Sequence, residues 1–209
     1  MDVLKSQNIV ARQRHAFSDG YRPPHRINHQ ANIQALANRD VSTILAIQST
    51  GSLDPEITPG TFVVPDDFIN PWAPVTFYDD DRGHGVSEFS NPLRKSILES
   101  LQLQDHPYRN SGIYFQTRGP RFETPAEANL LADYGDIVGM TAGSEVTLAR
   151  EKDMDYATVC SVDNYVNGVS GESIDMESFE ASVDEHVPTV VDVLETILKR
   201  SFNLTLPEG

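Results

Sequence analysis

The chain has 209 residues, of which 39% are hydrophobic and 22% are charged, which excludes a disordered or fibrous protein and predicts one domain over residues 1–209. Its 31 acidic and 16 basic side chains give a formal net charge of −15, so we expect no nucleic-acid partner. No apolar run reaches the roughly 18–20 residues of a membrane span, and the amino terminus does not resemble a signal peptide. With a single cysteine, Cys160, these features predict a cytoplasmic protein without a membrane partner.

The first half of the chain predicts strands that alternate with helices. The apolar spacing in 28–38 is typical of an amphipathic helix, and the β-branched run over 41–48 is typical of a buried strand. The predicted order is a loop over 12–26, a helix over 28–38, a strand over 41–48 halted by a turn at 49–53, a strand over 61–65, a loop over 66–92 and a helix over 91–103.

The second half continues the alternation. Thr124 and Glu127 have the spacing of a capping box, with Pro125 at the first helical position. The predicted elements are strands over 112–116, 136–140 and 155–162, helices after Thr124 and near 144–152, a loop over 163–174, and a carboxy-terminal helix with an apolar face of Phe179, Val183, Val187, Val190, Val191, Leu194 and Leu198. This alternation predicts an α/β domain of three layers.

Polar segments that contain glycine follow several of the predicted strands, at 48–53, 116–127, 138–146 and 162–168. In an open α/β sheet, ligands bind at the carboxyl ends of strands, so these segments are candidates for a small-molecule pocket. Ordinary turns explain the same spacing equally well.

Five ordered segments resemble one known family. They are PPHRINHQANIQAL (23–36), STGSL (49–53), PGTFVVPDDFI (59–69), GPRFETPAE (119–127) and VGMTAGSEVTLARE (138–151), followed by a strand that ends near Asn164. Together they are similar to the trimeric purine nucleoside phosphorylases and methylthioadenosine phosphorylases. The resemblance implies a three-layer fold with a central mixed β-sheet flanked by helices, a homotrimer, and phosphorolysis of a purine nucleoside to free base and sugar 1-phosphate. It implies neither a metal nor a cofactor, because inorganic phosphate is a co-substrate.

The resemblance also implies roles for single residues. Phosphate binding requires hydroxyls, backbone N–H groups and arginine, and the implied set is Arg14, His15, Ser49 and Thr141. Met140 would lie along the sugar and Phe122 would pack against the base.

Glu123 and Asn164 decide which base fits. A 6-oxopurine offers acceptors at O6 and N7 and a donor at N1–H. An asparagine amide can donate to O6 and accept from a protonated N7, while a carboxylate can accept from N1–H. An aspartate at position 164 would instead suit a 6-aminopurine. With Val166 two residues beyond Asn164, the pattern favours a 6-oxopurine enzyme. Without the family context, Glu123 could be an ordinary acidic residue at a helix start and Asn164 an ordinary turn residue.

The sequence gives fewer indications of which residues contact the 5′ group of the sugar. The stretch where related enzymes place a histidine contains none here, and Met176 or Phe179 could form an apolar pocket for a methylthio group. S-methyl-5′-thioinosine is therefore preferred over inosine or guanosine, although both residues could equally be core residues of the helix. His84 resembles a family position that reaches into the neighbouring subunit, and the segment 68–78 offers aromatic surface for a trimer contact.

Some positions depart from the family pattern. Residues 1–14 lack the glycine-rich strand turn with which members begin, so the resemblance implies a domain short at its amino terminus and without one phosphate ligand. Gln48 replaces a small residue and Asp163 stands where threonine is common. Two alternatives stay open: a methylthioadenosine phosphorylase, and a degenerate homologue that binds purine without efficient turnover.

Overall fold

The computed structural model describes residues 5–6, 9–15, 20–72, 75–171 and 173–202. Its strands are β1 (Lys5–Ser6), β2 (Ile9–Val10), β3 (Thr43–Ser52), β4 (Phe62–Val63), β5 (Asp67–Ile69), β6 (Tyr108–Arg109), β7 (Ile113–Gln116), β8 (Ile137–Gly139) and β9 (Asp155–Tyr165). Within the described residues, β1 and β2 pair as a hairpin, and the others form a seven-stranded sheet in the order β5-β7-β8-β3-β9-β4-β6. Parallel and antiparallel neighbours both occur, so the expected mixed sheet is confirmed.

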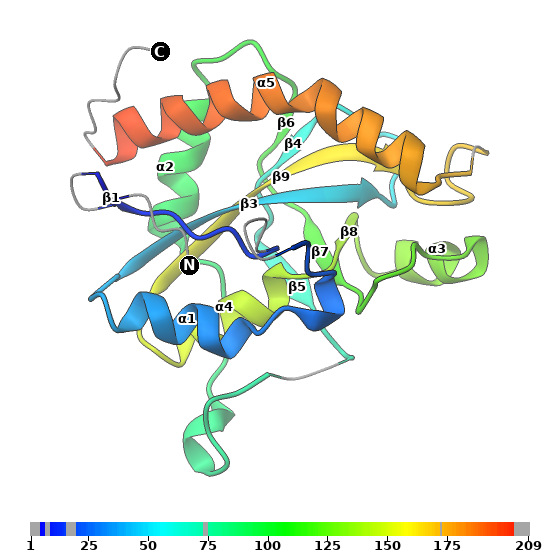
Figure 1. The fold of residues 1–209 in the computed structure, drawn as a ribbon. Helices are drawn as coiled ribbons and strands as arrows, with labels where there is room; N and C mark the ends of the chain where they lie inside the picture. Colours follow the sequence, from blue (N-terminus) through cyan, green and yellow to red (C-terminus); the bar gives the residue numbers. More distant parts are fainter. Residues whose placement is uncertain (1–4, 7–8, 16–19, 73–74, 172, 203–209) are drawn as a thin grey trace.

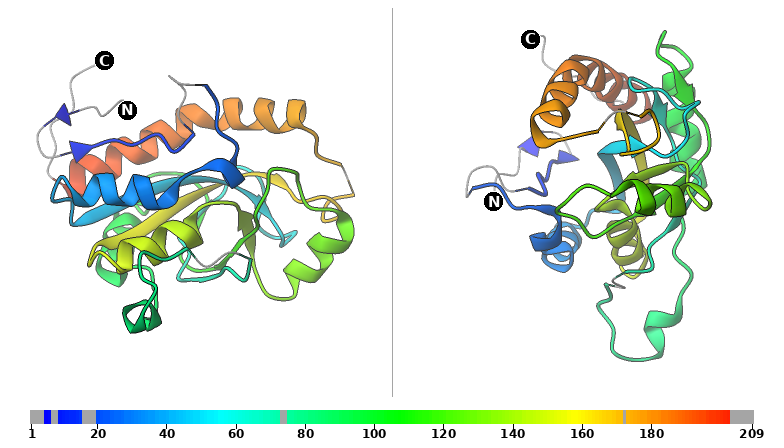
Figure 2. Two further views of the ribbon diagram at one scale, coloured as in Figure 1. Left: turned by 60° about the horizontal axis from the view of Figure 1, so that its bottom comes forward. Right: turned by 90° about the vertical axis from the view of Figure 1, so that its right-hand side faces the viewer.

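The helices cover the two faces of this sheet (Figures 1 and 2). They are α1 (His29–Ala37), α2 (Asn91–Leu101), α3 (Pro125–Ala132), α4 (Ala142–Arg150) and α5 (Met176–Ser201), with short 3-10 turns η2 (Pro24–Arg26) and η3 (Asp81–His84). The helices α1 and α4 pack together on one face, and α2 and α5 pack on the other. The predicted three-layer α/β architecture is confirmed.

The central strand β9 shows how the core is divided. Its side chains alternate between the two faces, as the pleat of a strand requires. Ala157 and Val159 are buried with side chains of α2 and α5, whereas Tyr156 is buried with side chains of α1 and α4. A strand that is buried on both faces needs a nearly continuous apolar sequence, and that pattern is what predicts a strand over 155–162.

The strand β3 is longer than predicted. The residues expected to form a turn at 49–53 continue the strand to Ser52, because β3 pairs in parallel with β9 and, at Gly51 and Ser52, antiparallel with β8. Gly51 has no room for a side chain, since a Cβ there would lie 2.9 Å from Val166 Cγ2. Small residues at this point therefore permit close packing of strands instead of ending one.

The direction of β8 positions the candidate site. Because β8 runs antiparallel to β3, the chain that leaves β8 travels back along β3 and reaches Thr141, the residue before α4, next to Gln48. The loop predicted over 66–92 also contains β5 and η3, which the sequence pattern did not indicate. Among the described residues, no helix is long and apolar enough to cross a membrane.

The structure corrects one predicted apolar helix face and reduces one predicted aromatic surface. On α5, Val187 and Val191 are 46% and 48% exposed, because the helix buries Val193 and Ile197 against α2 and the sheet instead. In the segment 68–78, Phe68 and Phe77 pack against the core and Trp72 is 55% exposed. Residues 73 and 74 of that segment lie outside the described residues.

Candidate active site

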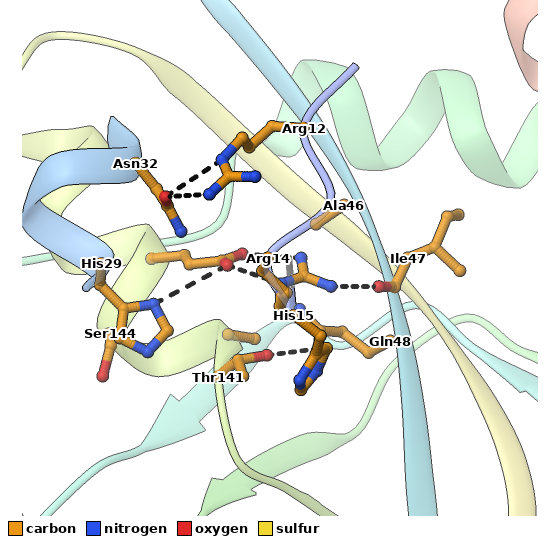
Figure 3. A network of polar contacts seen from close by, with 12 residues as sticks. Arg12, Arg14, His15, His29, Asn32, Ala46, Ile47, Gln48, Thr141 and Ser144 are labelled. Carbon is orange, nitrogen blue, oxygen red and sulfur yellow. Dashed lines mark hydrogen bonds and ion pairs between the residues drawn. The ribbon is translucent and has the colours of Figure 1, made fainter. Parts of the chain in front are cut away.

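The amino-terminal segment places Arg14 against the edge of the core. The Arg14 Nε and Nη2 groups donate to the two carboxylate oxygens of Glu145 at 2.7 and 2.9 Å, and Nη1 donates to the carbonyl of Ile47 at 2.9 Å. Glu145 lies in the first turn of α4, 131 residues away in the sequence. Each guanidinium nitrogen thus has an acceptor, and the side chain joins α4 to β3 (Figure 3).

The ion pair is strongly held because it is buried. Burial opposes the charge of Arg14, yet the charge and hydrogen bonds of Glu145 raise the pKa of the guanidinium above its ordinary value. Burial likewise disfavours the Glu145 carboxylate, but Arg14 and the Tyr156 hydroxyl, which donates to it at 2.8 Å, keep its pKa below the usual value. Both groups remain charged at neutral pH, and their charges cancel.

Two histidines lie in the same electrostatic environment and add no positive charge at neutral pH. Burial lowers the pKa of His15 below its ordinary value, with partial compensation from the Arg22 carbonyl 2.8 Å from Nδ1. Burial also lowers the pKa of His29, whose Nδ1 lies 3.8 Å from Glu145 Oε1. The cluster of Arg14, His15, His29 and Glu145 is therefore close to neutral at pH 7.

Gln48 and Thr141 lie beside this cluster (Figure 3). The Thr141 hydroxyl donates to Gln48 Oε1 at 2.6 Å, and both side chains are buried. Thr141 is the N-cap residue of α4, but its hydroxyl does not cap the helix. The amides of Thr141 and Ala142 donate instead to the Tyr114 hydroxyl, at 3.2 and 3.3 Å. A helix N-terminus with this geometry favours negative charge in front of it.

Asn164 lies at the carboxyl end of β9. Its Nδ2 donates to the carbonyl of Tyr165 at 2.8 Å, and a Cβ on Gly51 would lie 3.2 Å from that nitrogen, so the amide lies over β3. The preceding residue anchors the strand end: Asp163 accepts from Ser161 Oγ at 2.7 Å and faces His186 Nδ1 of α5 at 3.0 Å. Asp163, a departure from the family pattern, is thus a buried support for Asn164.

Glu123 lies at the start of α3, just before the capping box that Thr124 and Glu127 form as predicted. The residue is only 7% exposed, and its carboxylate is shown with no hydrogen-bond donor among the residues that the structure describes. Asn167 Nδ2 donates to the carbonyl of Glu123 at 2.9 Å, which ties this segment to the loop after Asn164. The structure therefore brings the two base-selecting candidates onto connected segments.

The remaining candidates differ in placement. Phe122 contacts Phe179 of α5, with ring centroids 5.4 Å apart, whereas Met176 is exposed. Met140 packs against Gly119, where a side chain would collide with the Met140 sulfur. Ser49 is exposed on β3, and His84 is exposed on η3. Val166 is buried in a core cluster.

The structure does not bring His84 to the other candidates within one chain. The turn η3 projects away from the sheet in every view (Figures 1 and 2). Its base is held to α4 by Glu151, which accepts from the amide of Phe77 at 2.7 Å and whose carbonyl accepts from the Tyr78 hydroxyl at 3.0 Å.

A cavity of about 290 Å³ lies beside the loop before α3. Trp72, Thr117 and Leu131 line it together with Glu123, and neither Asn164 nor Thr141 is among the lining residues. The cavity therefore touches the base-selecting end of the candidate site and does not extend to Arg14.

Sequence reasoning missed Glu145, Tyr156 and His29 as members of the site and treated Gln48 only as a departure. For Gln48 a signal existed, because a long polar side chain inside an apolar strand must find a partner when it is buried. For Glu145 the sequence shows only an acid in the first turn of a helix, which is common. The pairing with Arg14 depends on the fold.

Comparison with known proteins identifies the family. The model of the phosphorylase superfamily matches residues 7–199. A probable 6-oxopurine nucleoside phosphorylase of Archaeoglobus fulgidus is 38% identical over 180 residues, which cover 86% of this chain and 74% of that protein. A probable S-methyl-5′-thioinosine phosphorylase of Methanocaldococcus jannaschii is 36% identical over 204 residues, covering 96% and 81%.

A solved structure agrees with these relatives. The methylthioadenosine phosphorylase of Schistosoma mansoni in complex with adenine superposes with a TM-score of 0.79 at 25% identity, covering 92% of this chain and 76% of that one. The family expected from the sequence is confirmed, and the chain belongs to the phosphorylase superfamily.

Proposed function

We propose that the chain catalyses phosphorolysis of a 6-oxopurine nucleoside, with S-methyl-5′-thioinosine preferred over inosine or guanosine. The products are the free purine and the corresponding sugar 1-phosphate, as in purine salvage. The names of the relatives from Archaeoglobus fulgidus and Methanocaldococcus jannaschii support this reaction class.

One observation carries the choice of base. Glu123 is only 7% exposed and lines the cavity before α3, its carboxylate is shown with no hydrogen-bond donor among the described residues, and Asn167 links its segment to the loop that follows Asn164. A carboxylate on a cavity wall that is not engaged by the protein can accept a hydrogen bond from a ligand that supplies an N–H group. A 6-oxopurine offers that donor at N1, while its O6 accepts from the Asn164 amide. An adenine base has no N1–H, which disfavours the methylthioadenosine alternative.

The reaction requires groups at both ends of the broken bond. Positive charge develops on the sugar and negative charge on the departing purine, so the purine end needs donors at O6 and N7. We assign Asn164 and Glu123 to the purine, Phe122 and Met140 to its ring and the sugar, and Arg14, His15, Ser49 and Thr141 to phosphate beneath the anomeric carbon. Val166 supports Asn164 from the core cluster that it shares with Val138.

The active assembly is proposed to be a homotrimer in which His84 reaches a neighbouring subunit's site. The projecting position of η3 supports this, since within one chain His84 lies apart from the other candidates. The buried, reduced Cys160 fits a cytoplasmic location.

The experiment is a release assay with S-methyl-5′-thioinosine, inosine and methylthioadenosine side by side, each with and without inorganic phosphate. Phosphate-dependent release of the free base is expected, fastest as hypoxanthine from the thioinosine and slowest as adenine from methylthioadenosine. A second candidate, purine binding without turnover, is favoured by the neutral Arg14–Glu145 pair. Stabilisation by hypoxanthine without any release would support that candidate and refute phosphorolysis.

A further inference from the structure

Gln48 has one half of its side chain unsatisfied. The residue is 5% exposed, its Oε1 accepts from the Thr141 hydroxyl, and its Nε2 has no hydrogen-bond partner among the described residues. Buried polar groups in proteins are almost always paired, so an unpaired donor in a candidate site indicates a missing acceptor. Gln116 offers a contrast nearby: its Nε2 donates to Ser144 Oγ and its Oε1 accepts from the Ser144 amide.

The bond to Gln48 changes what Thr141 can offer a ligand. A threonine hydroxyl has a single hydrogen, and here it points at Gln48 Oε1. While that bond stands, the Thr141 oxygen presents only lone pairs to an anion. The neighbouring Arg14 is also largely engaged, because each of its three nitrogens donates one hydrogen bond to Glu145 or to the Ile47 carbonyl and Glu145 offsets its charge.

We propose that Gln48 determines the affinity of the anion subsite, with its Nε2–H₂ group replacing the Thr141 hydroxyl as the donor to a phosphate oxygen. The carboxamide acts as a relay: it takes the hydrogen bond of Thr141 on one side and offers its own donor on the other. The N-terminus of α4, which Thr141 precedes, lies at the same place and favours the negative charge. This inference rests on the proposed phosphorolysis, because phosphate is the anion concerned.

The test compares Gln48→Met with Gln116→Met. Each variant removes one carboxamide, and the two glutamines are about equally buried, but of the two only Gln48 has an Nε2 group without a partner among the described residues. We expect Gln48→Met to raise the Kd for inorganic phosphate by roughly 10- to 100-fold, the effect of losing a hydrogen bond to a charged group, with an unchanged Kd for hypoxanthine. Gln116→Met should lower the melting temperature without a selective loss of phosphate affinity.

Gln48→Glu provides a second test with the shape kept. The carboxylate can still accept from Thr141 but has no N–H group and repels the anion, so phosphate binding should fall further than in Gln48→Met. Unchanged or tighter phosphate binding in Gln48→Met would overturn the inference, because the freed Thr141 hydroxyl would then be the donor. Unchanged or tighter binding in Gln48→Glu would overturn it as well, because the subsite would then need no donor at position 48.

A measurement on the unaltered protein covers the case in which the variants do not fold. Crystals grown in phosphate should show a phosphate oxygen within hydrogen-bond distance of Gln48 Nε2. Phosphate bound elsewhere, or none bound, would refute the inference. Phosphate bound at Nε2 without nucleoside cleavage would leave the inference standing and refute the proposed phosphorolysis instead.

Discussion

The buried pair of Arg14 and Glu145 gives the sharpest test of the site's electrostatics. We consider Glu145→Gln, which keeps the shape and one acceptor but removes the negative charge. Breaking a buried ion pair from one side costs about 3–5 kcal/mol, because the remaining charge stays buried. The Arg14 side chain is 21% exposed and that of Glu145 is 9% exposed, so solvent screens part of the loss and we expect about 3 kcal/mol.

That loss is measurable by heat or urea. A chain of this size loses roughly 2–4 °C of melting temperature per kcal/mol, which predicts a decrease of about 6–12 °C in phosphate-free buffer. The control is Arg121→Gln, which removes an exposed Arg–Glu pair with the same 2.7 Å contact to Glu127 and should change the melting temperature little.

The same variant should respond more strongly to phosphate. With Glu145 neutral, the guanidinium of Arg14 has charge and N–H groups to offer, so phosphate should raise the melting temperature more in Glu145→Gln than in the parent. A decrease under about 2 °C in phosphate-free buffer, together with an unchanged phosphate response, would contradict the view that Glu145 neutralises Arg14.

Three further predictions concern the histidines near Glu145, the support of Asn164 and the oligomeric state. Burial lowers the pKa of His29 and His15, so the unfolded chain binds protons before the folded chain as pH falls below about 6.5. The melting temperature should therefore decrease from pH 7 to pH 5, and less steeply in His29→Asn; the same dependence on pH in the parent and the variant would contradict this. Asp163→Asn places an amide against the donors of Ser161 and His186, so calorimetry should show a lower melting temperature and kinetics should show a higher KM for nucleoside. An unchanged KM would show that Asp163 does not help to position the base. Light scattering at micromolar concentration should give about three times 23.2 kDa, and a monomer would refute the trimer.

Local signals in the sequence predicted the elements that local chemistry determines. The capping box of Thr124 and Glu127 begins α3 as expected, because both hydrogen bonds form within four residues. The helix α1 likewise begins where Asn28 can accept from the Ala31 amide. Elements whose limits depend on distant partners were misjudged: β3 continues through its small residues because β8 and β9 pair with it there.

The candidate site divides in the same way. The sequence resemblance identified Arg14 and Thr141, but it could not show that Glu145 neutralises the arginine or that Gln48 holds the hydroxyl. Those contacts join residues that are 131 and 93 positions apart and exist only because β8 returns antiparallel to β3. Periodicity also could not tell which valines of α5 face α2, and Val187 and Val191 proved to be exposed.

The measurement that tests the central claim most directly is the ratio of kcat/KM for S-methyl-5′-thioinosine over methylthioadenosine, in the parent and in Asn164→Asp. We expect a ratio well above one in the parent, because the proposed site has Asn164 donate to O6 and Glu123 accept from N1–H. In Asn164→Asp the carboxylate opposes O6 and accepts from a 6-amino group, so the ratio should fall by roughly 10- to 100-fold. A ratio that the substitution leaves unchanged would contradict the assignment of the base to Asn164.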